Sequence, residues 1–289
     1  MKISRLLVLI ATTFLLACSQ SGEDSCEDLS LSSLKIVSGT KCGDTDVSPV
    51  VLVELRKDGD RLGYCSGSVI GRRSVLSAAH CVEDVDEVRV KIGGSWQTAA
   101  SFIQHPDAQI DDGQIDDPAY DLSIIGLSAD HTINPLRLAK AAILQKGDEF
   151  SIFGFGQSGE FFNRDKTELR SGRMEAEKVR TGYFEASYDN DSSSICFGDS
   201  GGPALLVPSG GKVAEPVIIG VASAISPSLP LPLPLPIREQ KSIFAPFPLP
   251  FPIGGSSCPR GSKTYHASVY NQSAISFIQR YAPDVGFIE

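Results

Sequence analysis

The sequence predicts an all-β protein of antiparallel strands, arranged as a sandwich or a barrel. Short β-branched or apolar runs recur between turn signals, a spacing typical of such folds. The clearest runs are residues 50–55, 68–76, 88–92, 122–127, 150–155 and 217–222. Only the segment 272–281 has a helical pattern, in which Ile275, Phe277 and Ile278 can share one face. We therefore expect one short helix after the strands.

Composition limits the classes of partner. The chain has 289 residues with 42% hydrophobic content, enough for one large domain or two small ones. Its formal net charge is −9, whereas a nucleic-acid-binding protein needs a clustered basic surface. We therefore exclude nucleic acid as a partner.

The N-terminal segment 1–17 predicts export. A short basic stretch ends at Arg5, and the apolar run 6–16 follows it, which is typical of a signal peptide and too short for a comfortable transmembrane helix. The ending Leu-Leu-Ala-Cys resembles a bacterial lipobox, which implies cleavage before Cys18 and a lipid on that cysteine. Ser19 then favours the outer membrane, on its periplasmic or its outer face. The alternative is a plain secretory signal followed by an unmodified cysteine.

The cysteine count agrees with lipidation. An exported protein lies in an oxidising compartment, where cysteines form disulfides. Seven cysteines cannot all pair within the chain, but six remain if a lipid occupies Cys18.

Three residues are candidates for nucleophilic catalysis. Ser200 lies in CFGDSGGP, which is either an ordinary turn or a nucleophile loop. His80 ends an apolar run beside Cys81, and Asp121 begins another apolar run that can carry its carboxylate inward. The remaining histidines have polar or turn-like surroundings: His105, His131 and His266.

An acidic loop precedes Asp121 and is expected to be a solvated surface. Its carboxylates are Asp107, Asp111, Asp112, Asp116 and Asp117. They lack EF-hand spacing, so we expect neither a metal site nor a cofactor.

The motifs SAAHC, YDLSII and CFGDSGGP follow one another in the order His, Asp, Ser. In this order they resemble the trypsin/chymotrypsin-like serine protease family, from Ile36 to the end of the chain with one long insertion. The resemblance implies two antiparallel six-stranded β-barrels and a short C-terminal helix, with the barrels at 36–138 and 139–289. It also implies a serine endopeptidase that acts on proteins or peptides.

The resemblance assigns a role to each motif. Ser200 would attack the scissile carbonyl, His80 would act as general base and acid, and Asp121 would orient the imidazole. The backbone amides of Gly198 and Ser200 would form the oxyanion hole. Two disulfides are implied as well: Cys65–Cys81 beside the histidine and Cys196–Cys258 at the specificity pocket.

The resemblance further implies a zymogen. Ile36-Val37-Ser38-Gly39 matches the family's activated terminus, and Lys35 precedes it as a tryptic site, so 18–35 would be a propeptide cut by an activating protease. The freed Ile36 amine would pair with Asp199. In the family a cysteine near Cys42 often pairs within the C-terminal barrel, but 150–180 contains none, which leaves Cys26 as its expected partner.

Specificity residues follow from the same resemblance. Ser194, six residues before the nucleophile, would form the base of the S1 pocket without an acid to attract lysine or arginine. Ser223, Ala224 and Ile225 match part of the family's GIVSWG pocket wall. Ile225 would narrow the pocket, so we expect small or apolar P1 residues.

The proline-rich insertion 226–257 departs from the family. Its alternate prolines favour extended polyproline II rather than a helix or a central strand. It is either a lid or docking arm near the substrate or a tolerated surface insertion. The alternative function is therefore a surface adaptor lipoprotein on a protease scaffold, with a partner bound by this insertion.

Overall fold

The computed structural model describes most of the expected barrels but not the N-terminal leader or the insertion. The described residues are 26, 29, 33–36, 39–43, 45–111, 113–156, 168–187, 194–208, 211–226 and 262–289. Several sequence expectations thus lie outside them: the signal 1–17, Cys18, the proline-rich segment beyond 226 and Cys258. In the described part, no helix is both long and apolar enough to cross a bilayer.

The first barrel closes from six strands that pair in the order β10-β5-β4-β3-β6-β7. Their bounds are β3 Val50–Lys57, β4 Asp60–Val69, β5 Ser74–Ser77, β6 Glu87–Ile92, β7 Ser95–Gln104 and β10 Ser123–Leu127. Inward-facing aliphatic side chains such as Val53, Val75 and Ile125 are fully buried in its core. The expected strand 68–76 is wrong as a single element, because a turn at Gly71 divides it between β4 and β5, with the Ile70 amide donating to the Ser74 carbonyl at 2.9 Å.

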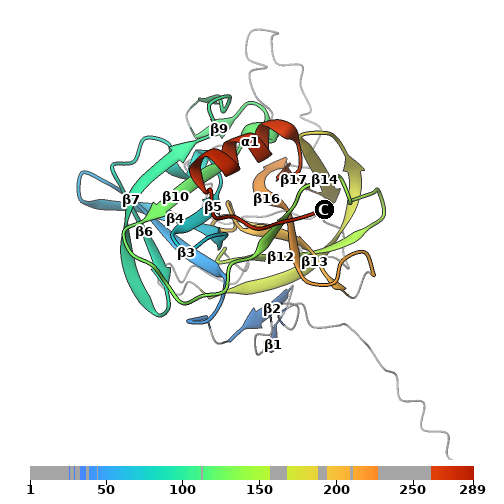
Figure 1. The fold of residues 1–289 in the computed structure, drawn as a ribbon, viewed down its shortest axis with the longest axis horizontal. Coiled ribbons are helices and arrows are strands. Elements are labelled where there is room, and N and C mark those ends of the chain that lie inside the picture. The colour runs from blue at the N-terminus through green and yellow to red at the C-terminus, as the bar shows by residue number, and fades with distance from the viewer. Residues whose placement is uncertain are drawn as a thin grey trace, which may run out of the picture.

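The second barrel closes in the order β12-β13-β14-β17-β16-β15, and β15 pairs back with β12. Its strands are β12 Glu149–Gly154, β13 Arg170–Val179, β14 Tyr183–Ser187, β15 Pro203–Leu206, β16 Val217–Ser226 and β17 Lys263–Ser268. The two barrels lie side by side (Figure 1). The predicted fold of two antiparallel six-stranded barrels is confirmed.

Short strands extend the second barrel. β1 (Ser33–Ile36) pairs with β2 (Gly39–Cys42), which pairs with β13. β11 (Arg137–Ala139) runs parallel to β16 and to β18 (Phe287–Ile288). β8 (Ile110–Asp111) and β9 (Gln114–Ile115) form a small hairpin within the acidic loop. β2, inside the expected unit 36–138, and β11, which crosses its end at 138, thus pair with strands of the second barrel.

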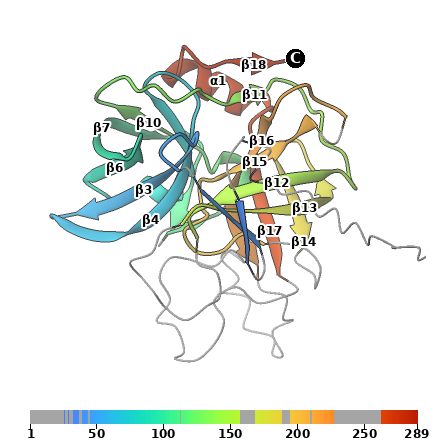
Figure 2. The same ribbon diagram turned by 90° about the horizontal axis from the view of Figure 1, so that it is seen from below.

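The helix α1 (Gln272–Tyr281) has the predicted bounds. Asn271 caps it, because its side-chain oxygen accepts a hydrogen bond from the Ala274 amide at 2.9 Å. Ile275, Phe277 and Ile278 are buried, as their shared face predicted. The helix lies at one end of the molecule, next to β18 and β11 (Figure 2).

Candidate active site

The candidate histidine is placed by the end of β5. Ser74–Ser77 is buried throughout and leads through the fully buried Ala78 and Ala79 into a short 3₁₀ turn, η2 (His80–Val82). His80 Nδ1 lies 2.8 Å from Asp121 Oδ2, and the His80 amide donates to Asp121 Oδ1 at 3.0 Å. A ring nitrogen that faces a carboxylate carries its hydrogen, so Nε2 is left with a free lone pair.

Asp121 is positioned by the segment that leads into β10. The turn η3 (Pro118–Tyr120), capped by Asp117, delivers it fully buried to the start of β10. Its carboxylate also accepts a hydrogen bond from Ser223 Oγ of β16, at 2.6 Å. Both barrels therefore hold this one carboxylate.

The charges of this pair are coupled. Burial acts to raise the pKa of Asp121, but the charge of His80 and the hydrogen bonds from His80 and Ser223 outweigh it, so the pKa lies below 3.8. Burial acts to lower the pKa of His80, yet the charge and hydrogen bond of Asp121 raise it above 6.5. The arrangement thus favours an ionised carboxylate beside an imidazole that accepts protons readily.

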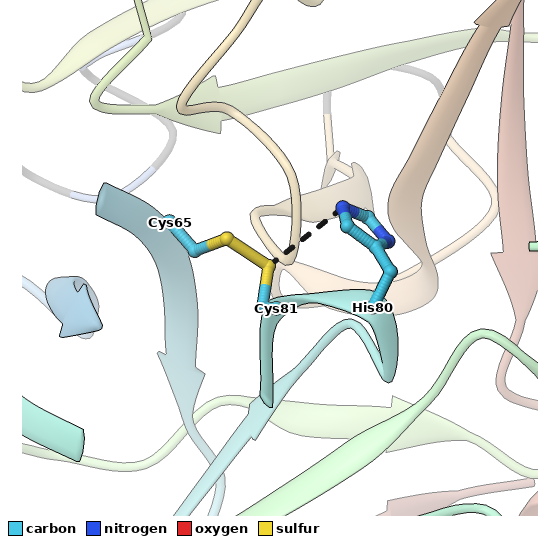
Figure 3. A group of neighbouring side chains, drawn as sticks. All are labelled: Cys65, His80 and Cys81. Carbon is cyan, nitrogen blue, oxygen red and sulfur yellow. Dashed lines mark hydrogen bonds between the residues drawn. A yellow bond between two sulfur atoms is a disulfide. The ribbon is translucent and has the colours of Figure 1, made fainter. Parts of the chain in front are cut away.

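A disulfide joins Cys65 of β4 to Cys81, next to the histidine. Figure 3 shows the His80 ring beside this bridge, with Nε2 lying 3.8 Å from Cys81 Sγ. The ligand atoms of Cys65, His80 and Cys81 all lie within 4.8 Å of one another. Because both sulfurs are in a disulfide, the group offers no thiolate to a metal ion.

Ser200 lies against the same disulfide. Cys81 Sγ is 3.8 Å from the Ser200 carbonyl oxygen, so the serine backbone and the imidazole contact one sulfur atom. Among the described residues, no hydrogen bond joins Ser200 Oγ to His80 Nε2. Catalytic hydrogen bonds are often loose in proteins without bound substrate and tighten in the complex. The structure thus brings the three predicted residues to one place without closing this contact.

The loop around Ser200 depends on glycine. Gly198 has φ +97° and Gly201 has φ +83°, a region that side-chain-bearing residues rarely adopt. At Gly201 a side chain would also collide with the Ser66 carbonyl and Ser77 Oγ. Glycine at positions 198 and 201 is therefore required by the shape of the loop.

Asp199 points away from Ser200 into the second barrel. Its carboxylate accepts hydrogen bonds from the amides of Gly156, at 2.7 Å, and Cys196, at 2.8 Å. Part of its surface is exposed, but the carboxyl group is enclosed, because a side chain on Gly154 or Gly156 would collide with it. Burial raises its pKa to about 6, although the two amides and the charge of Arg170 act to lower it. No described residue forms an ion pair with Asp199.

The predicted cleavage site lies within β1, where Lys35 pairs with Thr40 and Ile36 pairs with Gly39. Cys26 forms a disulfide with Cys42, the residue that ends β2. Cys26 Sγ is buried and lies 3.2 Å from Ser171 Oγ of β13, within the segment where the family's usual partner cysteine is missing.

The pocket candidates lie around β16. Ala224 and Ile225 pair with Tyr265 and Thr264 of β17, and Ala224 packs with Tyr265 and Ile115. Ser194 is half-buried, and its hydroxyl donates to the Ile195 carbonyl. Cys196 is disulfide-bonded, while its expected partner Cys258 lies outside the described residues.

The sequence expectation for His266 is wrong. His105 does lie beside a turn, with Nδ1 accepting from the Asp107 amide at 3.2 Å, but it is also buried. His105 is buried against the rings of Tyr120 and Phe277, at 5.2 and 5.0 Å between centroids. His266 is fully buried in β17 and stacks on Phe184, and burial lowers its pKa to about 3. His266 thus lies in apolar packing between segments distant in the sequence, whereas His105 combines ring contacts with a hydrogen bond between Nε2 and Ser273 Oγ, at 3.1 Å.

Sequence reasoning also missed two serines. Ser223 was expected in the pocket wall, but its hydroxyl bonds to Asp121. The sequence carried one signal for Ser223, which matches the serine of the family's GIVSWG pattern. Ser66, which follows Cys65, contacts the loop around Ser200, and nothing in the sequence indicated that contact.

Comparison with known proteins agrees with this geometry. The family model for trypsin matches residues 36–230. Collagenase from Hypoderma lineatum is 29% identical over 182 residues, which are 56% of this chain and 66% of that protein. Chymotrypsin-like elastase family member 1 from Homo sapiens is 25% identical over 149 residues, which are 46% of this chain and 57% of that protein. The matched segments thus span about two thirds of the collagenase and less of the elastase.

A solved structure of HL collagenase has the same fold. It superposes with a TM-score of 0.60 and 21% identity, covering 86% of this chain and 99% of that one. At this identity the likeness supports the fold alone. The family model, in contrast, covers more than half of the chain and includes all three motifs, and the chain therefore belongs to the trypsin family.

Proposed function

We propose that the chain is a serine endopeptidase that hydrolyses peptide bonds through an acyl-enzyme on Ser200. The observation that carries the proposal is the chain of hydrogen bonds from Ser223 through Asp121 to His80, which ends beside the Ser200 backbone. This arrangement holds the imidazole with Nε2 free, as a general base requires.

The reaction proceeds in two displacements. Ser200 Oγ attacks the scissile carbonyl while His80 Nε2 takes the hydroxyl proton, and the imidazolium is stabilised by Asp121. The same proton passes to the leaving amine as the peptide bond breaks. Water then attacks the acyl-enzyme by the same route and releases the carboxylic acid. The amides of Gly198 and Ser200 stabilise the oxyanion in both steps.

The first experiment tests the nucleophile. A fluorophosphonate probe should label the chain at Ser200 after cleavage at Lys35, and Ser200→Ala should abolish the label. The matched control is Ser95→Ala, an exposed serine at the start of β7 that should keep the label. If the native chain is labelled neither before nor after cleavage, the proposed peptidase activity is refuted.

The chain is further proposed to be a zymogen activated by cleavage after Lys35. In the uncut chain the carboxylate of Asp199 is enclosed with two amides and no ion-pair partner among the described residues, so a new ammonium group would stabilise it. Insertion of the Ile36 amine would supply that group. The Lys35→Gln chain should then remain unlabelled after trypsin treatment.

The Cys26–Cys42 disulfide gives cleavage a second consequence. The propeptide 18–35 would stay attached through sulfur, and a lipid on Cys18 would keep the protease at the outer membrane. Fractionation of cut protein tests this: the catalytic part should leave the membrane only after reduction. Release without reductant would refute the tether, and a Cys18→Ser chain that still sediments with membranes would refute the lipid.

Specificity is proposed to favour small or apolar P1 residues, because Ser194 supplies no charge and Ile225 is branched. A peptide-library profile dominated by arginine or lysine at P1 would refute this. The adaptor alternative, through the proline-rich insertion, predicts that Ser200→Ala keeps the biological role.

A further inference from the structure

Ser66 is a buried serine of β4 that uses every polar group it has. Its amide donates to the Ser200 carbonyl at 2.8 Å, and its hydroxyl donates to the Gly198 carbonyl at 2.8 Å. The same hydroxyl accepts from the Phe155 amide at 2.9 Å. Its own carbonyl accepts from Ser77 Oγ. A side chain from the first barrel thus binds two segments of the second.

The two carbonyls that Ser66 holds belong to peptides next to those that carry the oxyanion amides. The Gly198 carbonyl belongs to the peptide between Gly198 and Asp199, which lies between the peptides that carry the Gly198 and Ser200 amides. The Ser200 carbonyl belongs to the next peptide along the chain. Because each peptide is planar, fixing these carbonyls restricts the Ser200 amide, which lies between them, and the Gly198 amide, which adjoins the Gly198–Asp199 peptide. Gly198 needs such restriction most, since its φ of +97° lies in a region where glycine is conformationally free.

The hydroxyl also reaches the carboxylate of Asp199 through the backbone. Phe155, whose amide Ser66 accepts, stands between Gly154 and Gly156, and both glycines pack against the Asp199 carboxyl group. The Gly156 amide donates directly to Asp199 at 2.7 Å. One hydroxyl therefore connects the segment around Asp199 to the peptide beside the oxyanion amides.

We infer that Ser66 is a positioning residue for the oxyanion hole, whose hydroxyl holds the Gly198–Asp199 peptide in the orientation that aims the Gly198 and Ser200 amides at the substrate. This inference rests on the proposed peptidase activity. Removing the hydroxyl leaves the Gly198 carbonyl and the Phe155 amide without this partner, in a fully buried place where an unmade hydrogen bond is costly.

The chain offers a matched control on the same strand. Ser68 is also fully buried, but its hydroxyl has no hydrogen-bond partner among the described residues. Ser66→Ala and Ser68→Ala therefore remove the same atom from the same strand. Only the first removes the bonds to Gly198 and Phe155.

The experiment compares both variants after cleavage at Lys35, using a chromogenic peptide and two inhibitors of the same peptide sequence. A trifluoromethyl ketone forms an oxyanion on Ser200, whereas a reduced-bond analogue has a methylene in place of the scissile carbonyl. We expect Ser66→Ala to lower kcat about tenfold with little change in KM, below the 100- to 1000-fold typical of losing a donor outright. The ketone Ki should rise by the same factor and the reduced-bond Ki should not change, while Ser68→Ala stays within about twofold of the native enzyme.

Two outcomes overturn the inference: native kcat and ketone Ki in Ser66→Ala, or a parallel rise in both inhibition constants. Should Ser66→Ala fail to fold, Ser66→Cys keeps a side chain of similar size with a weaker donor, and the same inhibitors decide. Fluorophosphonate labelling of the native chain precedes these assays. Absence of label refutes the proposed function, whereas a labelled native chain with an unaffected Ser66→Ala refutes this inference alone.

Discussion

The charge of Asp199 should destabilise the uncut chain at neutral pH, and Asp199→Asn should remove that destabilisation. Burial raises the pKa of this carboxyl group from 3.8 to about 6 in the folded chain. A carboxyl group with a raised pKa contributes stability that is present below 3.8 and is lost as pH rises through 6. The rise of the Asp199 pKa from 3.8 to about 6 corresponds to a loss of roughly 3 kcal/mol in the free energy of unfolding at high pH.

The expected result is a pH-dependent difference between two chains. Asparagine cannot ionise, so it lacks the loss that the native carboxyl group undergoes. From pH 4.5 to pH 8 the free energy of unfolding of Asp199→Asn should rise relative to the native residue by about 2 kcal/mol, the part of the total that falls within this window. Taking the difference between chains cancels the titration of the other carboxyl groups.

The assay is urea unfolding followed by circular dichroism at both pH values, with disulfides intact. Both chains carry Lys35→Gln so that neither can be activated. Asp116→Asn, which removes one exposed carboxylate from the acidic loop, controls for the change in net charge. A difference between native and Asp199→Asn that stays constant with pH, or that moves in favour of the native chain as pH rises, would show that the Asp199 charge does not destabilise the fold.

Three further predictions concern the site and its scaffold. In the proposed mechanism His80 is the general base, and its pKa lies above 6.5. As pH falls, kcat/KM should therefore reach half its maximum at a pH above 6.5, and Asp121→Asn should move that midpoint to lower pH; a pH–rate profile with an identical midpoint in both chains contradicts this. Ser223→Ala should lower the free energy of unfolding by roughly 2 kcal/mol in urea titrations, because a buried carboxylate loses a hydrogen bond; an unchanged midpoint of unfolding would count against that bond. Asn271→Ala removes the N-terminal cap of α1 and should lower the free energy of unfolding by about 1 kcal/mol, so the midpoint of thermal unfolding should fall.

The candidate catalytic residues and the helix were predictable from the sequence. The order of SAAHC, YDLSII and CFGDSGGP identified His80, Asp121 and Ser200, because each motif is local and its spacing does not depend on distant contacts. The bounds of α1 were predictable for the same reason, since a helical face repeats within a few residues. Strands with polar faces were not predictable in this way. The half-exposed strand β7 was missed, because no apolar run marks it.

Contacts between residues distant in the sequence became known from the folded structure. Ser223 reaches Asp121 across 102 positions of sequence, and Ser66 reaches Gly198 across 132. The neighbours of Cys26 and the burial of His266 likewise follow from packing between separate strands. No periodicity encodes such pairs, because they depend on how two closed barrels pack together. Strand pairing joins residues that are far apart in the sequence, so the partners of a buried polar group are fixed only when the barrels have closed.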